Sequence, residues 1–183
     1  MMFFMIICGV DDAGRGSMIG PLVISGITID KKNVKKVKSI GVQDSKKLSS
    51  KKREILYKKI IEIVDDYYVV RISPKTIDQN VFKHKLNHLE AKNMAKVIKK
   101  LDPHTAYVDS CDVDYKRFGR EISSLTSNSR IVSRHHADSR FTVVAAASII
   151  AKVSRDKSIH RLKKNFDLGS GYPSDKNTVK YVK

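Results

Sequence analysis

Two adjacent carboxylates stand at the end of the first apolar run of the sequence. Asp11 and Asp12 follow the run at residues 2–10, and a Gly-Arg-Gly segment comes shortly after them. Ionised carboxylates at the end of a buried strand repel each other and lose hydration, so a divalent cation such as magnesium or manganese is their natural counter-charge. The two glycines let the backbone turn tightly, with N–H groups free to hold a phosphate oxygen. A solvated junction between a strand and a turn would show the same residues, and both interpretations stay open at this point.

Two more acidic residues stand at the ends of predicted elements. Asp109 follows the apolar run at residues 106–108, and Asp138 precedes an alanine-rich segment at residues 145–151. The ends of strands in open α/β sheets converge on one crevice, so we expect these carboxylates near the first two. Two divalent ions held there would activate both the attacking water and the leaving oxygen of a phosphodiester. Taken singly, each of these two residues would equally serve as a helix cap or a turn residue.

The composition is basic along the whole chain. Lys and Arg number 36 against 19 Asp and Glu, which gives a formal net charge of +17. Counterion release drives nucleic acids onto basic surfaces, so a nucleic-acid partner is expected. A high lysine content also occurs in merely soluble or thermophilic proteins, which leaves that alternative open.

The cysteines and the apolar runs indicate a cytoplasmic protein. The sequence has 2 cysteines and no CxxC pair, which fits a reducing compartment. No run reaches the roughly 20 apolar residues that a membrane span requires, so no membrane partner is expected. The opening apolar run lacks a basic leader and a cleavage site, and we interpret it as a buried first strand.

Alternating strand and helix patterns must position the carboxylates. Runs rich in β-branched residues predict strands, and apolar residues at helical spacing opposite lysine-rich faces predict helices. The 183 residues suffice for one α/β domain. We expect strands at about residues 2–10, 21–29, 67–72, 106–108 and 130–133, and helices at about 50–64, 86–101, 113–125 and 140–157.

Five segments of this chain resemble signatures of ribonuclease HII, the single-chain type 2 ribonuclease H, and they occur in family order. They are Gly9-Val10-Asp11-Asp12-Ala13-Gly14-Arg15-Gly16, Asp44-Ser45-Lys46-Lys47-Leu48, Tyr107-Val108-Asp109, Ala137-Asp138, and Ala145 to Lys152 with Arg155-Asp156. The resemblance implies a ribonuclease H-like α/β fold with a mixed five-stranded sheet flanked by helices. It also implies two Mg2+ or Mn2+ ions and cleavage of the RNA strand in RNA–DNA hybrids or 5′ to ribonucleotides embedded in duplex DNA. The products would carry a 3′-hydroxyl and a 5′-phosphate.

The resemblance also implies roles for individual residues. The Gly-Arg-Gly backbone would contact the ribose 2′-hydroxyl, the group that distinguishes RNA from DNA at one position. Lys46 would hold a phosphate, and Tyr172 matches the family tyrosine that stacks on the sugar at the RNA–DNA junction. The metal-binding and catalytic residues would be Asp11, Asp12, Asp109 and Asp138, and the substrate-binding residues would be Gly14, Arg15, Gly16, Lys46 and Tyr172.

The chain departs from the family pattern at two places. Asp12 stands where the family carries glutamate, and the sequence stops at Lys183, where the family continues through a helical segment. We therefore expect a monomeric catalytic domain over residues 1–183 with that segment truncated. Binding of a sliding clamp stays open, because the usual place for such a motif lies past the last residue.

Other functions remain to be distinguished. The altered second acid would suit a catalytically weak or silent hybrid-binding module on the same fold. A different nuclease or recombinase of the superfamily would cleave DNA that lacks ribonucleotides. The adjacent His135 and His136 lack cysteines or a third ligand at zinc-binding spacing, so we expect structural or surface roles for them.

Overall fold

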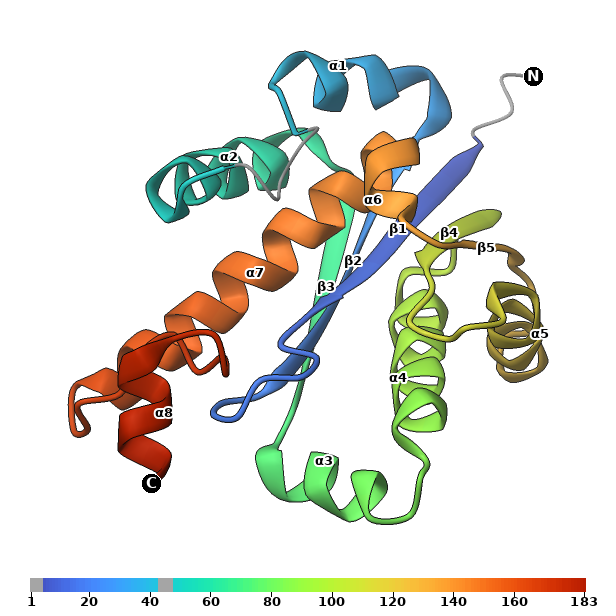
Figure 1. The fold of residues 1–183 in the computed structure, drawn as a ribbon. Coiled ribbons are helices and arrows are strands. Elements are labelled where there is room, and N and C mark those ends of the chain that lie inside the picture. The colour runs from blue at the N-terminus through green and yellow to red at the C-terminus, as the bar shows by residue number, and fades with distance from the viewer. Residues whose placement is uncertain (1–4, 43–47) are drawn as a thin grey trace.

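A mixed five-stranded sheet lies at the centre of the protein (Figure 1). The computed structural model describes residues 5–42 and 48–183. Among these residues the strand order is β3-β2-β1-β4-β5, with β1 antiparallel to β2 and parallel to β4. The predicted fold class is confirmed. The strands are β1 (Ile6–Ala13), β2 (Leu22–Asp30), β3 (Asp66–Ile72), β4 (Thr105–Asp109) and β5 (Arg130–Arg134).

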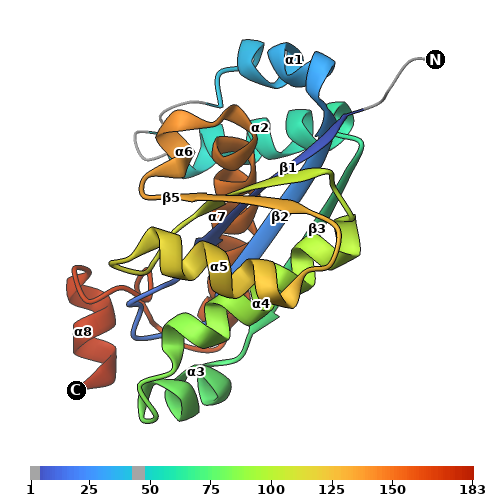
Figure 2. The same cartoon turned by 90° about the vertical axis from the view of Figure 1, so that its right-hand side faces the viewer.

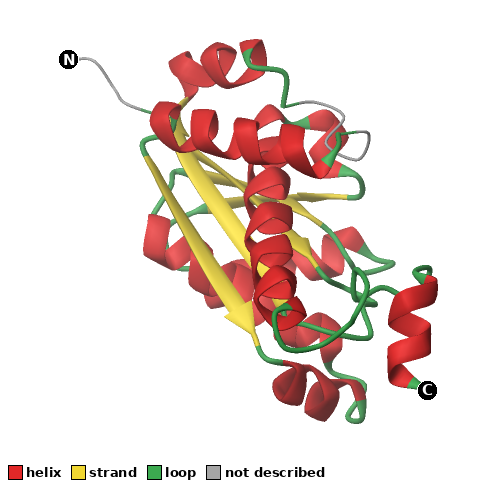
Figure 3. Ribbon diagram, turned by 90° about the vertical axis from the view of Figure 1, so that its left-hand side faces the viewer, coloured by secondary structure: helices red, strands yellow, loops and turns green. Residues whose placement is uncertain are grey.

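Helices cover both faces of the sheet. Figure 3 shows the longest helix, α7, crossing one face, and Figure 2 shows α4 and α5 on the other. Helices α1 and α2 lie on the α7 side (Figure 1). The helices are α1 (Val34–Ser39), α2 (Ser50–Ile63), α3 (Pro74–Val81), α4 (Leu86–Leu101), α5 (Tyr115–Leu125), α6 (Ala137–Arg140), α7 (Thr142–Lys163) and α8 (Lys176–Val182).

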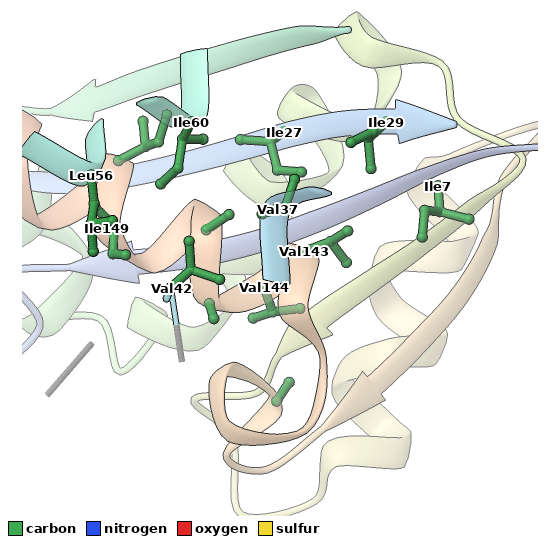
Figure 4. Packing of buried hydrophobic residues seen from close by; sticks show 14 of the residues in the cluster. Ile7, Ile27, Ile29, Val37, Val42, Leu56, Ile60, Val143, Val144 and Ile149 are labelled. Carbon is green, nitrogen blue, oxygen red and sulfur yellow. The ribbon is translucent and has the colours of Figure 1, made fainter. Parts of the chain in front are cut away.

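The alternation of side chains along β1 divides the core into two layers. Ile7 belongs to the cluster under α7, where it joins residues such as Ile27 and Ile149 (Figure 4). Cys8 and Val10 belong to the cluster under α4. By the same alternation Asp11 faces the α7 layer and the next residue faces α4.

Helix α7 approaches β1 very closely because of Gly9. A Cβ atom at this position would lie 2.2 Å from the carbonyl carbon of Val143, which is closer than atoms can pack. The buried alanines 145–147 continue this close contact along the helix. Their small side chains bring the backbone of α7 down to the strand that carries the first carboxylates.

Most boundaries agree with the sequence signals. Ser49 and Ser73 cap α2 and α3 by accepting backbone N–H groups, as expected for serines that precede helices. The predicted helix at 140–157 is instead α6 followed by α7, which extends to Lys163, and α1 was not predicted. None of the helices in the described part of the chain is long and apolar enough to cross a membrane.

Candidate active site

Three of the four predicted carboxylates meet at one edge of the sheet. The parallel register pairs Val10 with Val108, so the next residues, Asp11 and Asp109, lie side by side. Asp109 is the last residue of β4, whereas Asp11 lies inside β1: the prediction that the first strand ends at residue 10 is wrong, because pairing with β2 continues to Ala13. The Asp109 carboxylate accepts the backbone N–H of Ala137 at 2.7 Å, which places α6 and therefore Asp138 at the same edge. The charges of both other acids act on Asp11. The structure thus brings together residues from three separate segments of the sequence.

Asp11 lies in surroundings that disfavour a negative charge. It is 5% exposed, and this burial, followed by the charge of Asp109, raises its pKa to about 7. Hydrogen bonds from Ser148 and from the backbone N–H of Asp12, the latter at 2.8 Å, oppose this increase in pKa. The site therefore needs a positive charge, which either a proton or a bound cation would supply.

Asp12 turns away from this group, toward the α4 side of the sheet. It is half-buried, and burial, followed by the charges of Asp11 and Glu90, raises its pKa well above the ordinary value, while Arg15 opposes the increase. Asp12 is therefore coupled to the other carboxylates through charge, although its side chain starts from the opposite face.

The donor set fits a hard divalent cation. Carboxylate oxygens are the ligands that Mg2+ and Mn2+ prefer. The charges of Asp109 and Asp138 both act on Asp11, so negative charge is concentrated around this carboxylate. In residues 5–42 and 48–183 no three His, Cys, Asp or Glu side chains already form an arrangement ready to hold a metal.

A buried glutamate supports the Gly-Arg-Gly segment, and the sequence analysis missed it. Glu90 lies on α4 with its side chain fully buried, and Oε2 accepts hydrogen bonds from the Arg15 guanidinium and the Cys111 thiol. Burial raises the pKa of Glu90. A sequence signal existed, because Glu90 occupies a position on the apolar face that continues through Met94 and Val97.

The turn after β1 exposes the backbone of Gly16, while its arginine points to α4. Arg15 also donates to the Asn87 side chain at 2.9 Å, so its guanidinium is held by α4. Gly14 and Gly16 adopt φ values of +105° and +71°, which side chains disfavour. Gly16 is exposed, and apart from its chain neighbours no atom of the described residues lies within 4 Å of the position of a Cβ. Its backbone is therefore accessible to a ligand.

The loop that carries Tyr172 lies directly against this turn. The backbone N–H groups of Met18 and Ile19 donate to the carbonyl of Gly171 at 2.7 and 3.2 Å. Two predicted substrate-binding segments, about 155 residues apart in sequence, are therefore neighbours. The remaining predicted substrate-binding residue, Lys46, lies outside the described residues.

His135 occupies a packed position. Its Nε2 lies 2.8 Å from the carbonyl oxygen of Asp112, and its ring meets that of Tyr115 edge-on at 5.2 Å between centroids. These contacts agree with the structural role expected for this residue.

Comparison with solved structures defines the class of the protein. The crystal structure of ribonuclease H2 from Pyrococcus horikoshii OT3 aligns with a TM-score of 0.91 and 45% identity, covering 97% of this chain and 85% of that one. A chain in the structure of the PCNA:RNase HII complex from Archaeoglobus fulgidus aligns with a TM-score of 0.91 and 41% identity, covering 97% and 87%. The sheet and its flanking helices are those of a ribonuclease H fold.

Sequence comparison narrows the class to one family. The family model described as Ribonuclease HII matches residues 8–183. The Ribonuclease HII of Cenarchaeum symbiosum (strain A) is 52% identical over 179 residues, covering 98% of this chain and 87% of the relative. The chain belongs to the ribonuclease HII family. Its family and fold support ribonuclease H activity on RNA–DNA hybrids, the reaction of an endoribonuclease.

Proposed function

We propose that this protein cleaves the RNA strand of hybrids and also cuts 5′ to ribonucleotides embedded in duplex DNA, leaving a 3′-hydroxyl and a 5′-phosphate. The observation that carries the proposal is the meeting of Asp11, Asp109 and Asp138 at one edge of the sheet. The turn at residues 14–16 starts from the same strand, so a reader of the 2′-hydroxyl would lie next to the acids.

The four acids Asp11, Asp12, Asp109 and Asp138 would hold two divalent ions, Mg2+ or Mn2+. Bound there, the ions would activate the attacking water and stabilise the leaving 3′-oxygen. Ser148 would fix the orientation of the first of these acids by its hydrogen bond.

The remaining residues would bind and orient the duplex. Backbone groups of Gly14, Arg15 and Gly16 would contact the 2′-hydroxyl and the neighbouring phosphate, while the Arg15 side chain stays on α4. Tyr172 would stack on the sugar at the RNA–DNA junction, and Lys46 would hold a phosphate. The net charge of +17 would attract the substrate along the whole surface.

We also propose that the protein acts as a monomer in the cytoplasm, which suits a repair nuclease that acts on single lesions in DNA. The relative from Archaeoglobus fulgidus was solved with PCNA, so a sliding clamp is a candidate partner for this protein too.

Digestion of a duplex that contains one ribonucleotide tests the proposal. We expect Mg2+ or Mn2+ to be required, with one cut 5′ to the ribonucleotide and a 3′-hydroxyl product in end-group analysis. The Asp109→Asn variant serves as the matched inactive control, and an all-DNA duplex should stay intact. A 2′,3′-cyclic phosphate would refute the metal mechanism. Tight binding without cleavage would favour the silent module, and cleavage of the all-DNA duplex would favour another nuclease of the superfamily.

A further inference from the structure

A buried arginine on α7 connects the two substrate-binding segments. Arg155 is 2% exposed, and its guanidinium donates to the carbonyls of Ile19 at 3.1 Å and Ser170 at 3.3 Å. The same guanidinium stacks on Tyr172, with its central carbon 4.2 Å from the centre of the ring. One side chain therefore contacts the turn after β1, the loop before α8 and the tyrosine itself.

The backbones around this arginine leave no space for adjustment. Figure 1 shows the turn after β1 and the loop before α8 lying beside the C-terminal half of α7. A Cβ atom at Gly14 would lie 2.8 Å from Nε of Arg155, and one at Gly171 would lie 2.9 Å from its Nη2. Both glycines thus permit the close approach of backbone to guanidinium. The turn and the loop are packed around Arg155 as well as bonded to it.

The charge of Arg155 has no carboxylate partner within the described ranges. Its sequence neighbour Asp156 pairs instead with Arg53, at 3.1 Å, and Nε of Arg155 has no hydrogen-bond partner among the described residues. An apolar side chain of similar volume would avoid the cost of removing this charge from water. A role in stability alone does not account for the arginine. Its fork and its flat face match two carbonyls and one ring.

Helix α7 also connects this arginine to the group of carboxylates formed by Asp11, Asp109 and Asp138. Ser148, which hydrogen-bonds Asp11, lies seven residues before Arg155, which corresponds to about 10 Å along the helix. We infer that Arg155 is a positioning residue, which holds the ring of Tyr172 at a fixed place relative to the turn at residues 14–20. The turn that would contact the 2′-hydroxyl and the ring that would stack on the sugar then keep a fixed position relative to each other. This inference rests on the proposed function for the roles of the two segments.

The first experiment measures the position of the ring without any catalysis. The sequence has no tryptophan, so Tyr172→Trp creates a single fluorescent probe. Quenching by acrylamide should increase at least about twofold when Arg155→Met is added, because the ring loses the cation that covers one face. Arg161→Met removes the same charge from an exposed position on the same helix and should leave quenching unchanged. Equal quenching with and without Arg155→Met would refute the inference.

The second experiment measures the energetic coupling between Arg155 and Tyr172 in the cleavage of a duplex with one ribonucleotide. Arg155→Met should lower kcat/KM about 10- to 30-fold, as expected for loss of a desolvated cation–π contact. Tyr172→Ala should show a similar loss, and the double variant should lose little more, because both changes disrupt one unit. Independent, multiplying losses would show that Arg155 does not act through the ring. Arg161→Met is again the control.

Two further results keep the outcomes distinct. If Arg155→Met fails to fold, as judged by thermal unfolding, Arg155→Lys replaces it. Lysine keeps the charge without the planar fork and should give an intermediate loss, whereas full activity and unchanged quenching would refute the inference. Failure of the parent protein to cut the single-ribonucleotide duplex would count against the proposed function instead, and the quenching result would still test the placement of the ring.

Discussion

The surroundings of Asp11 predict that its replacement stabilises the metal-free protein. Burial and the charge of Asp109 raise the pKa of Asp11 from 3.8 to about 7, so the folded protein binds this proton more tightly than the unfolded chain. The contribution of Asp11 to stability is therefore greatest at low pH and is lost as the pH rises from about 4 to about 7. Asp11→Asn removes this charge but keeps an oxygen that accepts the N–H of Asp12.

The size of the effect follows from the difference in pKa. Between 3.8 and about 7 the difference corresponds to about 4 kcal/mol at pH 8 as an upper value. For a chain of this length, that is a rise in Tm of roughly 8 to 16 °C. Thermal unfolding in EDTA at pH 8 and at pH 4 measures it, and the gap between Asp11→Asn and the parent should nearly vanish at pH 4.

Magnesium and a matched variant complete the test. Mg2+ should stabilise the parent at pH 8 and have little effect on Asp11→Asn, because the variant has lost a ligand. Asp78→Asn, an exposed acid on α3, should change Tm by less than about 2 °C at either pH. The explanation would be refuted if Asp11→Asn were no more stable than the parent at pH 8. It would also be refuted if the gain in stability at pH 4 were as large as at pH 8.

Three further predictions concern binding, turnover and the support of the turn. Binding of Asp109→Asn to a hybrid in Ca2+ should weaken about 100-fold or more between roughly 50 and 200 mM salt, and a flat titration would refute the charge argument. Asp12→Glu should raise turnover up to about 100-fold at unchanged affinity, because the carboxylate gains the reach of one methylene; equal or lower turnover would show that the site has adapted to aspartate. Arg15→Ala should lower the free energy of unfolding in urea by about 1 to 3 kcal/mol by leaving the buried Glu90 charge without its partner, and adding Glu90→Gln should restore most of it. No recovery in the double variant would count against this pairing.

The elements of the fold were predictable because their signals are local. The β-branched run at residues 21–29 pairs with β1 as a hairpin, and Ser49 and Ser73 cap the helices that they precede. Gly9 had no such signal. It permits the approach of Val143, and this contact joins residues that are far apart in the sequence, so only the folded chain reveals it.

The site was predictable only in part, for the same reason. Acids near strand ends can be found because a parallel sheet brings such ends together, and Asp11 and Asp109 follow that rule. The residues that hold the substrate-binding segments in place follow no such rule. Glu90 resembles any helix acid until α4 is placed beneath Arg15, and Arg155 resembles any helix arginine until the loop of Tyr172 closes over it.

The contacts of Glu90 and Arg155 hold the turn after β1 from opposite faces of the sheet. On the α4 side, Glu90 holds the Arg15 side chain. On the α7 side, Arg155 fixes the far end of the same turn to the loop of Tyr172. The turn is thus held from both faces of the sheet by buried charges, while the backbone of Gly16 within it is exposed. Because the turn is already ordered, less conformational entropy is lost when a substrate binds. Selective recognition of one 2′-hydroxyl requires such preorganisation.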